Sequence, residues 1–69
     1  MKLSARNVLK GKVVEVVSGV TTGRVKIAVA GGTVITSSIT MEAVQDLELK
    51  VGDEASAIIK ASDVIVAKL

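Results

Sequence analysis

The chain has to fold without any of the residues that usually stabilise a very small domain. Its 69 residues include no cysteine, histidine, phenylalanine, tyrosine or tryptophan, although 49% of them are hydrophobic. Disulfides and zinc sites built on cysteine or histidine are therefore excluded, and a domain of this size buries only about 60% of the surface of its unfolded chain. We expect a single domain over residues 1–69, stabilised by a large, obligate interface between copies of the chain.

Alternation of apolar and polar residues predicts β-strands in the first half of the chain. Residues 8–17 have apolar side chains on both faces, as in a strand that is buried on both sides. Residues 24–30 alternate strictly, and residues 33–38 are rich in β-branched side chains. Glycines in residues 18–23 and at Gly31-Gly32 indicate the turns between them. We therefore expect a three-stranded meander.

The second half of the chain is predicted to add one short helix and two further strands. Residues 40–47 carry good helix formers, and Ser38 or Thr40 could cap the helix. Residues 54–60 and 64–68 are the expected fourth and fifth strands. This order is that of an all-β, OB-type five-stranded Greek-key barrel with one short helix between strands three and four.

Composition argues against several classes of function. The net charge of +2 provides no broad basic face, and the chain has no aromatic side chain on which the bases of a single strand could stack. Nucleophilic catalysis needs a base beside the nucleophile, and we do not expect an enzyme in a chain without histidine or cysteine. No apolar run suits a signal peptide or a transmembrane helix. We expect a soluble, cytoplasmic protein with no membrane or nucleic-acid partner.

Two clusters of hydrogen-bond donors, one near each end of the chain, form the candidate functional site. They are Ser4-Ala5-Arg6-Asn7 and Lys60-Ala61-Ser62. Each combines a permanent cation with a hydroxyl group and a small neighbour, and neither contains a carboxylate. If the fold brings the two ends together, these donors suit a small oxyanion that is fully ionised and needs no acceptor. Each cluster taken alone is also compatible with ordinary solvated surface charges.

At these residues the chain resembles the molbindin, or Mop, domain family. The resemblance runs from Lys2 to Leu69, and its most specific parts are the opening Ser-Ala-Arg-Asn and the late Lys-Ala-Ser. It implies an OB-type barrel that assembles as a homo-oligomer, a hexamer built as a trimer of dimers, and binds molybdate or tungstate between subunits. The oxyanion-binding residues that it implies are Ser4, Ala5, Arg6, Thr40, Lys60, Ala61 and Ser62, with Thr40 supplied by a neighbouring subunit.

The resemblance also implies a second type of oxyanion site near the threefold axis, to which we assign Ser18, Gly19 and Val20. The implied function is storage, buffering or delivery of the oxyanion inside the cell, with no free metal cation, no organic cofactor and no chemistry on the ligand. Two alternatives from other classes remain open. One is a nucleic-acid-binding OB module, and the other is a purely structural oligomerisation domain.

Overall fold

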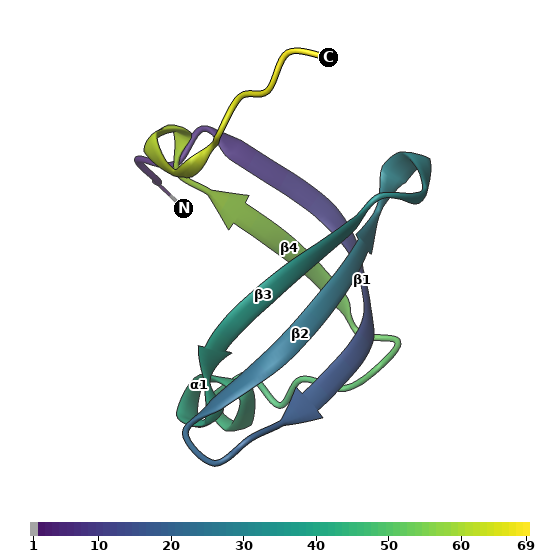
Figure 1. The fold of residues 1–69 in the computed structure, drawn as a ribbon. Helices are drawn as coiled ribbons and strands as arrows, with labels where there is room; N and C mark the ends of the chain where they lie inside the picture. The colour runs from purple at the N-terminus through teal and green to yellow at the C-terminus, as the bar shows by residue number, and fades with distance from the viewer. Residues whose placement is uncertain (1) are drawn as a thin grey trace.

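The computed structural model describes residues 2–69, and within them the chain forms four strands, one short α-helix and two 3-10 turns (Figure 1). In chain order these are β1 (Asn7–Ser18), β2 (Thr22–Val29), η1 (Ala30–Gly32), β3 (Val34–Thr40), α1 (Met41–Asp46), β4 (Glu54–Ile59) and η2 (Ala61–Asp63). Each of the four strands begins and ends within two residues of its predicted bounds, so their prediction from apolar pattern, β-branched content and glycine turns is confirmed.

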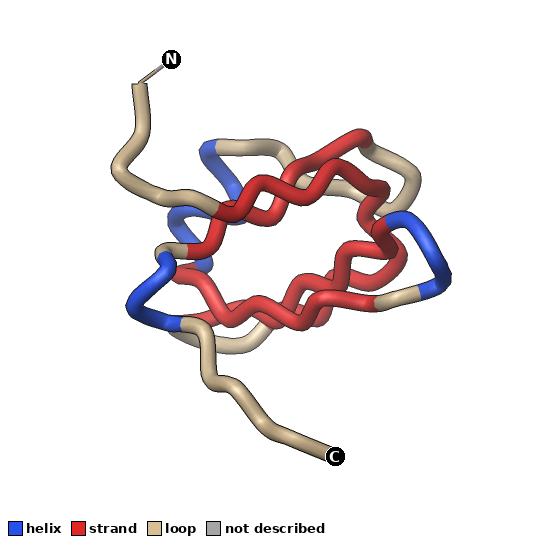
Figure 2. The backbone as a smooth tube through the Cα atoms, turned by 90° about the horizontal axis from the view of Figure 1, so that it is seen from above, coloured by secondary structure: helices blue, strands red, loops and turns tan. Residues whose placement is uncertain are grey.

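The four strands form one antiparallel sheet in the order β3-β2-β1-β4. β1 is the longest strand and pairs with two neighbours. Its residues 7–12 pair with β4, and its residues 11–18 pair with β2. Seen from above, the sheet curls round on itself so that its strands outline a ring (Figure 2). The all-β, OB-type architecture with a helix between the third and fourth strands is confirmed.

β1 passes from one neighbour to the other at Gly11 and Lys12, where its two pairings overlap. Gly11 is aligned with Val29 of β2 and with Ala55 of β4. A Cβ atom at this position would lie only 2.1 Å from the carbonyl oxygen of Ala28. A glycine inside a strand commonly marks such a close backbone approach, and here it lets β1 lie against β2 while it also pairs with β4.

The core is small and consists of aliphatic side chains on the inner face of the curled sheet. α1 closes one end of it, and its Thr40 cap accepts a hydrogen bond from the backbone amide of Ala43 at 3.1 Å through Oγ1, as expected for one of the two candidate caps. No helix among residues 2–69 is long and apolar enough to cross a membrane. The buried core residues are Val13, Val25, Ile27, Val29, Val44 and Ala57.

The predicted fifth strand, residues 64–68, is wrong for this structure. The backbone amides of Asp63 and Val64 donate to the carbonyls of Lys60 and Ala61, at 2.9 and 3.2 Å, and this tight η2 turn carries the chain away from the sheet (Figure 1). The tail beyond it packs on nothing, since Ile65 is 93% exposed. Its β-branched residues have strand propensity, but propensity forms no strand without a neighbouring edge and a covered face.

Candidate functional site

The register between β1 and β4 brings the two donor clusters together. Asn7, the first residue of β1, is paired with Ile59, the last residue of β4. Arg6 and Lys60 are therefore the first residues beyond the paired strands, one on each chain segment. The start of the chain and η2 lie next to each other at this end of the molecule (Figure 1). The two donor clusters therefore lie close together within one chain, as the oxyanion hypothesis requires.

The cations at this end of the molecule are open to solvent and carry no counter-charge. Ser4 and Arg6 are exposed, Ala5 is half-buried, and Lys60 is exposed. Across residues 2–69 the ion pairs all involve Glu15, so neither Arg6 nor Lys60 takes part in one. Both charges are thus available to an anion from solvent.

The η2 turn adds backbone donors to this surface. Its own hydrogen bonds are donated by the amides of Asp63 and Val64. The amides of Ala61 and Ser62 have no acceptor within the turn, as is general for the first residues of a helical turn. The exposed side chain of Asp63 is the one carboxylate that adjoins these donors in sequence, and it forms no ion pair among the described residues.

Thr40 is not brought to the two clusters within one chain. It ends β3 and caps α1, at the far end of β1 from Arg6 and Lys60 (Figure 1). Its Oγ1 accepts the capping hydrogen bond of Ala43, but a hydroxyl group can also donate, so its proton remains available. A site that includes both Thr40 and Arg6 consequently needs two copies of the chain.

The residues of the predicted second site lie in the turn between β1 and β2. Gly19 donates its backbone amide to the carbonyl of Thr22 at 3.0 Å, which closes the turn, and Val20 at its tip is 96% exposed. Ser18 is the last residue of β1 and is also exposed. The turn lies on the same side of the molecule as α1 and away from the two donor clusters (Figure 1).

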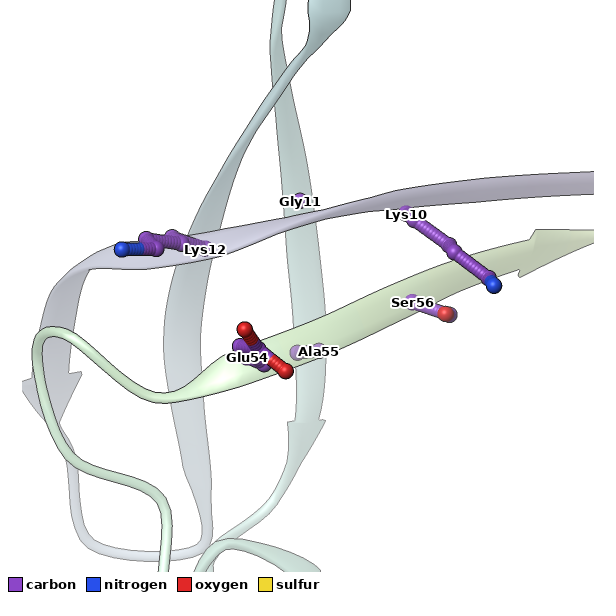
Figure 3. Close-up of a pocket in the computed structure, with 6 residues that line it drawn as sticks. All are labelled: Lys10, Gly11, Lys12, Glu54, Ala55 and Ser56. Carbon is purple, nitrogen blue, oxygen red and sulfur yellow. The ribbon is translucent and has the colours of Figure 1, made fainter.

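One hollow on the surface of the described residues was not singled out by the sequence. It has a volume of about 600 Å³ and runs over the outer face of β1 and β4, where Lys10 is paired with Ser56 and Lys12 with Glu54 (Figure 3). The side chains of Lys10 and Lys12 point away from each other, so these charges do not converge on one point. Residues 2–69 contain no group of three side chains that could hold a metal cation.

Comparison with known proteins identifies relatives over nearly the whole chain. Residues 3–66 match the family model of the TOBE domain. A probable molybdenum-pterin-binding protein of Haemophilus influenzae is 52% identical over 66 residues, which cover 96% of each chain. Molybdenum-pterin-binding protein 3 of Clostridium pasteurianum is 47% identical over 66 residues, covering 96% of this chain and 97% of its own. None of these names describes an enzyme, in agreement with the prediction.

Solved structures give the same result. MopII from Clostridium pasteurianum superposes with a TM-score of 0.91 at 45% identity, covering 97% of this chain and 100% of its own. A molybdate-binding protein from Sporomusa ovata gives 0.93 at 37% identity, covering 99% and 100%. The cytoplasmic molybdate-binding protein ModG, with molybdate bound, gives 0.91 at 52% identity, and this chain covers 46% of it.

The curled four-stranded sheet, the single capping helix and the cationic end together define a small OB-type domain that presents hydrogen-bond donors to solvent. The chain belongs to the TOBE domain family and, within it, to the molbindins.

Proposed function

We propose that this chain binds molybdate or tungstate at subunit interfaces of a homo-oligomer, and that it stores, buffers or delivers the oxyanion in the cytoplasm. The observation that carries the proposal is the pairing of Asn7 with Ile59, because Arg6 and Lys60 directly follow this last rung on the two neighbouring segments. The names of the relatives support molybdate as the ligand. We take residues 1–69 as one molbindin domain.

The donors at the cationic end suit a tetrahedral dianion. Arg6 offers a planar fork of N–H donors and Lys60 a compact ammonium group, and charge-assisted hydrogen bonds contribute about 1.5–3 kcal/mol each. The remaining proposed ligands are the hydroxyl groups of Ser4 and Ser62 and the backbone amides around Ala5 and Ala61. Because the ligand is held by reversible contacts alone, the mechanism is encapsulation and release.

The donor set also favours some oxyanions over others. Hydrogen phosphate carries a proton that needs an acceptor, whereas molybdate, tungstate and sulfate are fully ionised at neutral pH. A site made of donors therefore disfavours phosphate. Sulfate is smaller than molybdate, so we attribute discrimination between these two ions to the size of the closed site.

Two features of the isolated chain support the proposed homo-oligomer. Thr40 lies too far along the fold to reach the clusters of its own chain, so we assign it to the site of a neighbouring copy. Many apolar side chains are also left exposed, among them Val66 at 87% and Leu47 at 65%. Monomeric proteins rarely expose large contiguous apolar patches. We infer the hexamer, a trimer of dimers, from the resemblance to molbindins.

A second oxyanion site is proposed at the turn of Ser18, Gly19 and Val20. The turn is exposed and has no charged side chain, so backbone amides would have to supply the contacts. One turn offers few such donors. From the resemblance to molbindins, we place this site near the threefold axis of the hexamer, where the turns of neighbouring copies would add donors.

No organic cofactor forms part of the proposal, although the relatives' names mention a pterin. The donor clusters account for an inorganic oxyanion, and the chain has no aromatic side chain on which a pterin ring could stack. Molybdate alone should therefore bind.

Isothermal titration of the purified protein with molybdate and with sulfate tests the function. We expect heat from molybdate at micromolar protein concentration and weaker binding of sulfate. An absence of heat with both molybdate and tungstate would contradict the proposal.

Two measurements separate the proposed function from its rivals. A nucleic-acid-binding OB module would shift single-stranded DNA or RNA in a gel at moderate salt, and we expect no shift. A purely structural oligomerisation domain would melt at the same temperature with and without molybdate. A true ligand at 100 times its dissociation constant stabilises the folded state by about 2.7 kcal/mol per independent site, so we expect the melting temperature to rise.

A further inference from the structure

Asn7 is a polar residue in a position where the strand pattern calls for an apolar one. Burial alternates along the first half of β1, so Asn7, Leu9 and Gly11 face inward while Val8 and Lys10 face outward. The inward positions opposite them on β4 are all apolar: Ile59, Ala57 and Ala55. A polar side chain at the end of this apolar row is expected to have a hydrogen-bond partner.

The side chain of Asn7 forms a hydrogen bond between the two ends of the chain. Its Nδ2 donates to the carbonyl oxygen of Ile59 at 3.1 Å, across 52 residues of sequence. The other side-chain hydrogen bonds within residues 2–69 each span three residues, so this is the one that joins distant segments. It lies at the last rung of the β1–β4 pairing, directly before Arg6 on one segment and Lys60 on the other.

We propose that Asn7 is a positioning residue of the oxyanion site, and that its bond to Ile59 holds Arg6 at a fixed place beside Lys60. The inference rests on the proposed function. Strand ends fray, because the last rungs open at little cost in free energy. The hydrogen bond from Asn7 to Ile59, called the clamp below, opposes this fraying and preorganises the site. Preorganisation improves affinity by reducing the ordering that binding requires.

The variant Asn7→Leu tests this role, because leucine is similar in size, continues the apolar row and removes the donor. We expect the dissociation constant for molybdate to rise roughly three- to tenfold, the range of one hydrogen bond. The melting temperature of the ligand-free protein should stay at or above that of the wild type. Asn7→Val also removes the donor without adding charge and suits a strand, and it serves if Asn7→Leu does not fold.

Leu9→Ala is the matched control. It changes the next inward residue of the same strand and removes apolar contact with the core, but leaves the clamp in place. We expect a lower melting temperature and, well below that temperature, a dissociation constant within about twofold of the wild type. A purely structural Asn7 would behave like Leu9, with stability reduced and affinity kept, and this result would overturn the proposal.

Amide hydrogen exchange of the ligand-free protein gives a readout that does not depend on binding. In Asn7→Leu, exchange should accelerate at residues 59–62 and stay unchanged at the centre of β4. Weaker binding without this acceleration would show that Asn7 contacts the ion directly, and faster exchange with unaltered affinity would show that the clamp does not matter to the site. Either result overturns the proposal. Wild-type protein that takes up no molybdate overturns the proposed function instead, and the exchange data still test the clamp.

Discussion

Arg6 and Lys60 are the residues on which the proposed chemistry depends most, because each presents a permanent charge to solvent with no ion-pair partner in residues 2–69. Arg6→Ala removes a fork of charge-assisted donors, so we expect the affinity for molybdate to fall by more than tenfold. Titration calorimetry measures the change. Lys10→Ala, which removes an equal charge from the outer face of β1, should leave affinity almost unaltered. Equal affinities for Arg6→Ala and the wild type would contradict the role of Arg6.

Thr40 has two separable functions, a structural one as the cap of α1 and a proposed one as a ligand for a neighbouring copy. Thr40→Asp retains an oxygen that can accept from Ala43, and a carboxylate also suits a helix N-terminus. We therefore expect a melting temperature close to that of the wild type but loss of molybdate binding, because the carboxylate repels the anion. Thr40→Ser should keep both properties. Normal binding by Thr40→Asp would exclude Thr40 from the site.

Sequence reasoning placed Asn7 in the N-terminal donor cluster but gave it no role of its own, unlike the charged and hydroxyl-bearing residues of the candidate site. The residue types of Arg6 and Lys60 are visible in any linear sequence, and so is the capping preference of Thr40. The hydrogen bond from Asn7 to Ile59 cannot be seen in the linear sequence, because it depends on the register of two strands whose paired residues are 52 positions apart. An asparagine in an apolar alternating row is the only local signal that could have indicated it.

At the scale of single elements, β1 is the strand that determines the shape of the sheet, and Gly11 is its most sensitive position. Gly11→Ala would place a methyl group against the Ala28 carbonyl. We expect the free energy of unfolding to fall by about 3 kcal/mol, the upper end of the range for overpacked sites. Urea denaturation measures this loss. Ser56→Ala, an exposed change on β4, should alter stability by less than about 0.5 kcal/mol, and equal stability for both variants would contradict the close approach.

Four strands and the helix could be predicted from the sequence because each carries its signal within a few residues. Alternation, the Gly31-Gly32 turn and the cap of α1 are all local. The fifth strand failed for the opposite reason. Residues 64–68 have the composition of a strand, but the η2 turn directs them away from both free edges of the sheet. Whether such a segment forms a strand depends on whether it reaches a free edge of a sheet, and composition does not show this.

At the scale of the whole molecule, the exposed tail is apolar surface that the proposed assembly would cover. Ile65 and Val66 are almost fully exposed in the single chain. Replacing both with aspartate would place charge in any interface that covers them, so we expect sedimentation velocity to show smaller species than the wild type. Lys68→Gln is the control and should sediment like the wild type. Unchanged assembly of the double variant would mean that the tail stays outside the interface.

Native mass spectrometry of the protein loaded with molybdate tests the central claim most directly, because it reports the number of subunits and the number of ions on the same particle. If the site is completed at a subunit boundary, with Arg6 and Lys60 from one copy and Thr40 from another, molybdate should appear only on oligomers, and hexamers should carry several ions. Monomers released from the same sample should carry none. Monomers that retain molybdate, or oligomers that carry none, would contradict this account.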